Sequence, residues 1–372
     1  MLRHKEDEMR RCPQCGFPRR FSRFMEWHSD GTVIGSVRPR IPLMYVEVDE
    51  WDTLYDELVM TIGAPIEHIV VDAQKHIGMD LYDMVKGLYW NINAKRVPNT
   101  RWLRPQWLGK LLIRAMRNDL SGLGAGRAQL ERYRPGDHLT LRFTNPCLHL
   151  MVVGNCQGVY ESVEKMPGSR AGFKFDGDDL VVYLTPSEEK FASEDRLYLE
   201  EAEAGTGPLE YERCSSCGVP LAASRSLKWN IERGEIINPE TGKREDMLAV
   251  QSMNAILREL ERELGDEVVS IVYRAQKWYS LSRLNEDDGG KRPEPDSFWK
   301  DYLERMALRG MGYPAEFEAD DASVSVVMKN AYNQDLYAAK IAAGLEMLTG
   351  KPSSIVWEKR DRKNGAYKVT VA

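Results

Sequence analysis

Long apolar runs are missing from this 372-residue chain. The longest candidate, residues 148–153, is far shorter than the ~18 residues of a membrane-spanning helix, so we expect no membrane span. The first residues, MLRHKEDEMRR, hold no apolar stretch, so we expect no secretory signal. An excess of positive charge is also missing, since 51 Lys and Arg stand against 57 Asp and Glu. This balance argues against a nucleic-acid-binding protein.

Cysteine is scarce as well. Six cysteines in a chain of this length are too few for the disulfide framework of a small secreted protein. Four of the six form two C-x-x-C pairs, which favours intracellular thiols or metal ligands and predicts a cytoplasmic protein. Hydrophobic residues make up 42% of the chain, enough for a full-sized core without a covalent staple. The length leaves room for about two domains.

The two C-x-x-C pairs belong to an internal repeat with an offset of 202 residues. Residues 12–76 share 17 of 65 positions with residues 214–278, where unrelated sequences would share roughly 4. The shared positions include Cys, Gly, Pro and Trp, and both segments contain the tripeptide Ala-Gln-Lys near their ends. Looser matches continue at smaller offsets, so the second copy is shorter. A repeat of this length predicts a tandem duplication of one domain rather than a solenoid.

We expect the first copy at residues 1–200 and the second at residues 201–372. The stretch between them, residues 188–212, is acidic and contains Gly-Thr-Gly-Pro, a composition typical of a solvated linker. We also expect the two copies to pack about a pseudo-twofold axis, as an intrachain pseudo-dimer.

Each copy is predicted to be an α+β domain in which helices pack on a small antiparallel sheet. A C-x-x-C knuckle comes first and leads into a hairpin, at residues 23–37 in the first copy. Apolar residues at helical spacing then predict a helix over residues 51–62, with Gly63 as its C-cap. The equivalent helix covers residues 253–264, with Ser252 as its expected N-cap. Further helices and paired strands follow in both copies.

Cys12, Cys15, Cys214 and Cys217 are the predicted metal ligands. Each knuckle supplies two thiolates, and the glycine that follows lets the turn fold so that both sulfurs face one ion. A closed structural zinc site needs four ligands, so we expect the two knuckles to share one Zn²⁺. An iron–sulfur cluster would suit the same four thiolates, and a redox pair or simple free thiols remain the alternatives without a metal.

The end of the second copy carries a family pattern. It reads Asn330-Ala-Tyr-Asn, then a helix rich in small residues over 338–344, a Leu-Thr-Gly turn, and a strand ending in Tyr-Lys-Val-Thr-Val. This pattern resembles the 4-vinyl-reductase (4VR) domain, a family of predicted hydrocarbon-binding proteins. The resemblance implies an α/β fold that pairs into dimers and encloses an apolar pocket. Some members hold zinc with cysteines near the last strands. Those cysteines are missing here, so that internal zinc site is not expected.

The first copy is predicted to hold the ligand pocket, because residues 95–134 contain ten Lys and Arg but two acids. A basic rim suits a ligand with an apolar body and an anionic head, such as a carboxylate or an acyl thioester. The alternative is that the apolar residues fill the core and the basic face docks on the acidic linker. The candidate ligand-binding residues are Trp102, Arg104, Trp107, Lys110, Leu111, Arg114, Ala115, Met151 and Val152.

Three classes of function remain open. The first is a 4VR-type protein that binds a small apolar or amphipathic anionic molecule, carries a structural zinc, and serves an anaerobic hydrocarbon or aromatic pathway. The second is a metal-dependent enzyme or enzyme subunit. The third is a scaffold or assembly protein with a protein partner or a homodimer. His149 and Cys156 lie too far apart on one helix to act as base and nucleophile. The small residues Gly154 and Gly158 on either side of Cys156 are instead expected to allow close helix packing. The sequence therefore favours binding over catalysis.

Overall fold

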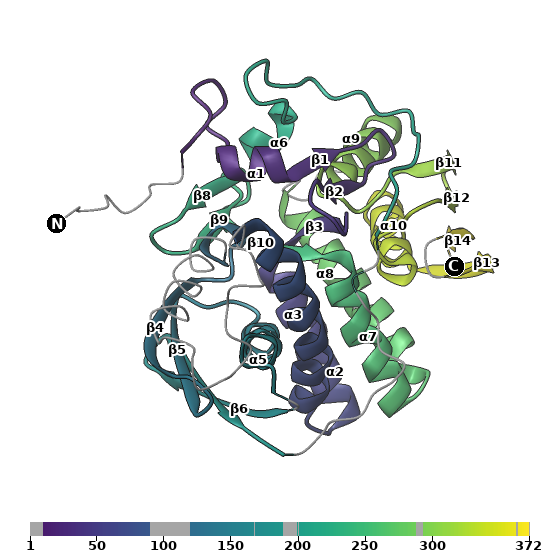
Figure 1. Ribbon diagram of the computed structural model, residues 1–372. Helices are drawn as coiled ribbons and strands as arrows, with labels where there is room; N and C mark the ends of the chain where they lie inside the picture. Colours follow the sequence, from purple (N-terminus) through teal and green to yellow (C-terminus); the bar gives the residue numbers. More distant parts are fainter. Residues whose placement is uncertain are drawn as a thin grey trace.

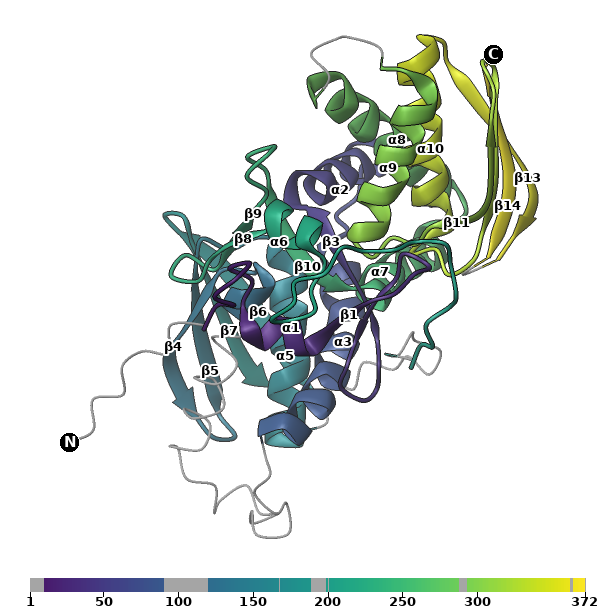
Figure 2. The same cartoon turned by 90° about the horizontal axis from the view of Figure 1, so that it is seen from above.

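The computed structural model describes residues 10–89, 120–166, 168–188, 199, 201–287, 293–361 and 364–371. Over these residues the chain combines helices with three antiparallel sheets, so the predicted α+β class is confirmed. Two four-stranded sheets lie at opposite ends of the molecule, and most of the helices lie between them (Figures 1 and 2).

The N-terminal half, up to residue 200, and the C-terminal half, from residue 201, run through the same order of described elements, except that α9 has no described counterpart. The N-terminal half contains α1 (Arg19–Phe24), β1 (Met25–Trp27), β2 (Val33–Gly35), β3 (Pro42–Glu47), α2 (Val48–Ile62), α3 (Glu67–Tyr89), β4 (Arg127–Arg134), β5 (His138–Thr144), α5 (His149–Glu164), β6 (Ser169–Asp176) and β7 (Asp179–Pro186).

The C-terminal half contains α6 (Leu221–Ser226), β8 (Lys228–Asn230), β9 (Glu235–Ile237), β10 (Arg244–Ala249), α7 (Val250–Leu264), α8 (Glu267–Asp287), α9 (Pro295–Leu308), β11 (Pro314–Ala319), β12 (Ser323–Met328), α10 (Gln334–Thr349), β13 (Ser353–Arg360) and β14 (Gly365–Val371). The two outer sheets have matching strand orders, β4-β5-β7-β6 and β11-β12-β14-β13.

Helix α2 forms where the apolar spacing predicted it, and it buries Trp51, Leu54 and Leu58. Gly63 ends the helix in the left-handed conformation, at φ 67°, which glycine adopts without steric cost. The prediction that Ser252 is the N-cap of the helix over residues 253–264 was wrong. Helix α7 begins at Val250, and Ser252 lies inside its first turn. Its hydroxyl makes a tertiary contact instead of capping the helix: it donates a hydrogen bond to the side-chain oxygen of Gln74 at 3.0 Å.

A six-stranded sheet joins the two halves, in the order β1-β2-β3-β10-β9-β8. Its central strands β3 and β10 pair antiparallel, and Tyr45 faces Met247, the residue 202 positions later. Both side chains are buried. The sequence analysis missed these two strands, although they form the junction on which the two halves are aligned.

Each half also reaches into the other. The indole N–H of Trp27 donates to the Leu308 carbonyl at 2.9 Å, and that of Trp229 donates to the Gly122 carbonyl at 2.8 Å. In Figure 1 strands β1 and β2 accordingly lie beside α9 of the C-terminal half. The main hydrophobic cluster draws on both halves, so they share a core rather than touching at a surface.

Over residues 201–212 the acidic connection is exposed or half-buried, as expected of a solvated linker, but it is also tied to the N-terminal half. The backbone N–H of Gly205 donates to the Asp30 carboxylate at 2.7 Å, and that of Leu209 donates to the Ser29 carbonyl at 3.1 Å. These bonds hold the connection against the turn between β1 and β2. The acceptors in that turn lie far from the connection in the sequence, so the sequence alone does not reveal this contact.

Small residues bring α3 and α5 into close contact, as the sequence predicted. A Cβ atom at Gly158 would lie 1.9 Å from the Lys75 carbonyl oxygen, and one at Gly154 would lie 2.4 Å from that of Val71. The two helix backbones therefore touch, and no side chain fits between them at these positions.

Buried charges cross the junction between β3 and β10. Glu47 and Glu245 face each other in the register, and both are buried. The guanidinium of Arg309, just after α9, binds both carboxylates, and the Tyr279 hydroxyl donates to Glu47 at 2.6 Å. Burial raises the pKa of Glu245. Two facing carboxylates would repel each other without this cation.

We expect Arg309→Met to lower the free energy of unfolding by about 3–5 kcal/mol, because it leaves the buried Glu245 without its cation and leaves Glu47 with Arg283 alone. Urea denaturation measures the loss. Arg305→Met, an exposed position one turn earlier on α9, should change stability by less than ~0.5 kcal/mol. Adding Glu245→Gln to the Arg309 variant should restore part of the loss. Equal effects of the two arginine variants would contradict this account.

Asp246 on β10 is fully buried beside Arg244. Burial raises the pKa of its carboxyl to about 7, although the Arg244 charge opposes the shift. Its Oδ1 atom has no hydrogen-bond partner in the described part of the chain. The folded protein therefore favours the neutral acid.

The Asp246 carboxyl loses its proton at about pH 4 in the unfolded chain, whereas it keeps the proton up to about pH 7 in the folded protein. Asp246 therefore makes stability fall as the pH rises through that window. Asn does not titrate, so the free energy of unfolding of Asp246→Asn, relative to that of the natural chain, should rise by about 2 kcal/mol from about pH 5.5 to about pH 7.5. Urea denaturation of both proteins at the two pH values measures this difference. Parallel pH profiles for the two proteins would refute this assignment.

Candidate metal centre

The two C-x-x-C knuckles have the same local structure. In the first, the N–H of Gly16 donates to the Cys12 carbonyl at 2.9 Å, and in the second, Gly218 donates to Cys214 at 2.8 Å. Both glycines are left-handed, with φ values of 75° and 77°. A residue with a side chain would be strained there, so glycine sets the turn that aims both sulfurs the same way.

An arginine anchors each knuckle on the other half. Arg11 donates to the Trp229 carbonyl at 2.6 Å, and Arg213 donates to the Trp27 carbonyl at 2.8 Å. Arg11 and Arg213 are 202 positions apart, as are the two tryptophans. This reciprocal exchange brings the two knuckles face to face.

The structure brings the four predicted sulfurs together. Sγ of Cys12 lies 3.7 Å from Sγ of Cys214, and Sγ of Cys15 lies 3.5 Å from Sγ of Cys217. All four atoms lie within 4.8 Å of one another. A tetrahedral ion with metal–sulfur bonds near 2.3 Å requires sulfur separations of about 3.8 Å. The group could therefore hold one metal ion such as zinc.

The surroundings favour the thiolate at one ligand. Burial alone would raise the pKa of Cys12, but backbone N–H groups of Cys15 and Gln14 and the Ser216 side chain outweigh it and lower the pKa to about 6. Burial raises the pKa of Cys15 and of Cys217. A bound cation would remove these protons, because thiolates are the ligand form. The carboxamide oxygen of Gln14 also accepts hydrogen bonds from Ser215 and Ser216 and ties the knuckles together.

Four thiolates would complete a tetrahedral shell, and such closed shells are structural rather than catalytic. The remaining cysteines do not resemble nucleophiles. Burial raises the pKa of Cys156 to about 12, and it raises that of Cys147 well above its usual range. The ring of His149 packs against Phe173 and Phe175.

The predicted ligand-binding residues are only partly described. Trp102, Arg104, Trp107, Lys110, Leu111, Arg114 and Ala115 lie outside the described residues. Met151 and Val152 are 4% and 5% exposed and belong to hydrophobic clusters. The stripe that matches residues 107–115 in the C-terminal half, Trp299, Leu303 and Ala307, is also buried. These described residues fill the core.

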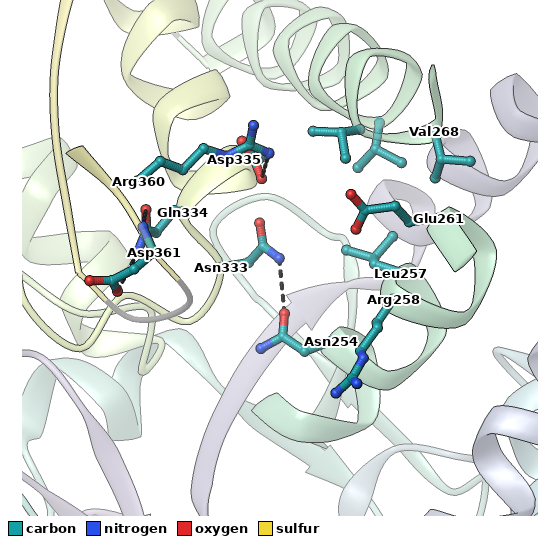
Figure 3. A pocket seen from close by; sticks show the side chains of 12 residues that line it. Asn254, Leu257, Arg258, Glu261, Val268, Asn333, Gln334, Asp335, Arg360 and Asp361 are labelled. Atoms are coloured by element: carbon teal, nitrogen blue, oxygen red, sulfur yellow. Dashed lines mark hydrogen bonds and ion pairs between the residues drawn. The ribbon is translucent and has the colours of Figure 1, made fainter. Parts of the chain in front are cut away.

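Sequence reasoning missed a groove of about 550 Å³ in the C-terminal half, shown in Figure 3. It lies where α7, α8, the start of α10 and the end of β13 converge. Its lining consists of Asn254, Leu257, Arg258, Glu261, Val268, Val269, Val272, Asn333, Gln334, Asp335, Arg360 and Asp361. These residues come from four separate elements, so no local motif marks them in the sequence.

None of the described helices is both long enough and apolar enough to cross a membrane. No family model, curated protein or solved structure matches this chain.

We expect the purified protein to hold one metal ion per chain, and Cys12→Ser or Cys214→Ser to release it. Each change removes one charged ligand from a four-ligand shell. Elemental analysis with native mass spectrometry measures the stoichiometry. Cys156→Ser is the matched control and should keep the metal, because this cysteine lies outside the cluster. Retention of the metal by both knuckle variants would exclude the shared site.

Proposed function

We propose that this protein is a small-molecule binding protein of the 4VR type, made of two copies of one domain that pair within the chain. A structural zinc ion clasps the two copies at their knuckles. The groove in the C-terminal half supports the proposed ligand binding, and the cysteine cluster supports the proposed structural zinc site.

Several reciprocal contacts support a duplication. The central strands pair antiparallel around Tyr45 and Met247, which are 202 residues apart, and the cysteine sulfurs also meet at a separation of 202 residues. The knuckle arginines exchange equivalent contacts, and the outer sheets repeat one strand order. An intrachain pseudo-dimer accounts for all of these pairings at once.

Zinc is the ion that best suits four cysteine thiolates in a compact, closed cluster. An iron–sulfur cluster would occupy more space than one ion, and sulfur separations of 3.5 Å and 3.7 Å suit a single tetrahedral centre. Such a centre leaves no coordination position for a substrate. This argues for a structural role and against the metal-dependent enzyme.

The groove has the volume of a small-molecule site, which usually spans about 300–1,000 Å³. Leu257 and the three valines give it an apolar wall, and side-chain amides, carboxylates and guanidiniums line the rest. This lining favours an amphipathic ligand over a pure hydrocarbon. A binding protein fits such a groove better than a scaffold, whose partner would need a broad apolar surface.

Native mass spectrometry of the protein as purified should report one zinc ion and a co-purified small molecule. Val269→Trp should displace that molecule, because Val269 lines the groove and is partly exposed. The zinc and the melting temperature should stay unchanged. Ser270→Trp, at the exposed neighbouring position outside the groove lining, is the control and should keep the ligand. If neither co-purified nor added amphiphiles bind the natural chain, the binding function is wrong.

A further inference from the structure

The groove has two chemically different walls, as Figure 3 shows. Leu257 and the valines of α8 form the apolar side, and the start of α10 and the end of β13 form the polar side. A ligand that fills it must therefore present an apolar flank to α8 and polar atoms elsewhere.

Most polar groups of the groove already have partners. Arg360 pairs with Asp335 at 2.6 Å, and the Gln334 side-chain amide donates to Asp361 at 3.3 Å. Asn333 donates to Asn254 at 2.9 Å, the bond drawn in Figure 3. These internal pairs leave the corresponding groups with little capacity for a ligand's charge.

Arg258 differs from them. It is exposed, it lines the groove, and it forms no ion pair within the ranges that the structure describes. The carboxylate of Glu261 lines the same groove, on the same helix, and is not paired with it. An unpaired guanidinium at the edge of a groove with an apolar wall can bind the carboxylate of a ligand whose tail lies along that wall.

The equivalent face of the N-terminal half is more acidic. Counting back 202 positions replaces Asn254 by Asp52, Arg258 by Asp56 and Val269 by Glu67. Partial burial, with the charges of Asp49 and Asp56 nearby, raises the pKa of Asp52 to about 6. These positions of the N-terminal half hold acids where the C-terminal half holds Arg258, so a carboxylate is bound less favourably there than beside Arg258.

We propose that the groove binds a small amphipathic monocarboxylate, with its carboxylate on Arg258 and its tail along Leu257 and the α8 valines. The proposal rests on the proposed binding function and names its ligand class. Glu261 and Asp361 on the lining oppose a second negative charge, so a dicarboxylate of the same length binds more weakly.

Octanoate and its neutral counterpart octanamide test the charge requirement on the full-length protein. Calorimetric titration should give octanoate the lower Kd. Arg258→Gln should weaken octanoate about tenfold or more and leave octanamide within about twofold. Arg262→Gln, one turn later on α7, removes a charge outside the groove lining and should leave both affinities unchanged.

Val269→Glu copies the acid of the N-terminal half into the groove and should weaken octanoate about tenfold, whereas Val269→Gln should not. Melting temperatures identify any variant that fails to fold, and the uncharged Gln variant keeps the test valid. Equal binding of octanoate and octanamide, unaffected by Arg258→Gln, would overturn the carboxylate assignment but leave small-molecule binding intact. If neither compound binds, the groove is not a ligand site and both proposals fail.

Discussion

The antiparallel pairing of β3 with β10 sets the geometry of the whole molecule. Tyr45 faces Met247, the residue 202 positions later, at the centre of this pairing, and residues on either side face partners at other separations, such as Glu47 with Glu245. The knuckles, the hairpins that carry Trp27 and Trp229, and the helices α2 and α7 are all arranged by this one register. A slip of one residue would turn the side chains of one strand to the opposite face relative to the other strand and would end the facing of Glu47 with Glu245. It would also separate the four cysteine sulfurs.

This junction is held by unusually polar chemistry. Arg309 neutralises the facing carboxylates of Glu47 and Glu245, and Lys340 pairs with the buried Glu50 at 2.8 Å between α10 and α2. Buried ion pairs contribute little net stability, because desolvation offsets most of the attraction. A buried charge that loses its partner destabilises the fold strongly, so these ion pairs discriminate against other strand registers. The cysteine cluster adds a second constraint at the hairpin end of the same interface.

The two halves pack the helices at corresponding places in their element order differently. In the N-terminal half Gly154 and Gly158 let α5 touch α3. In the C-terminal half the Trp299 ring lies against Gly344 of α10, where an added Cβ would lie 2.8 Å from it, and the core is filled with aromatic side chains. The groove opens where α7 meets the first turns of α8 and α10. The pocket predicted in the N-terminal half from a basic stretch depends mainly on residues 102–115, which lie outside the described residues.

The sequence by itself determined the features that local chemistry encodes. Helical spacing defined α2 and α7, the left-handed glycine ended α2, and the paired C-x-x-C motifs identified the four cysteines that meet. The glycines of α5 predicted close helix packing for the same reason, since a missing side chain acts wherever the backbone goes. Ser252 shows the limit, because a partner from the other half overrode its local preference for a cap.

Only the tertiary structure decided which strands join the halves and where a groove opens. Strands β3 and β10 are short, and their pairing partner lies 202 residues away, so the constraint that selects them is not local. The groove depends on four elements meeting at their ends, and Arg258 is informative only because its neighbours are already paired. Long-range pairing and unsatisfied charge are properties of an arrangement in space. A linear pattern can supply the residues for them but cannot bring them together.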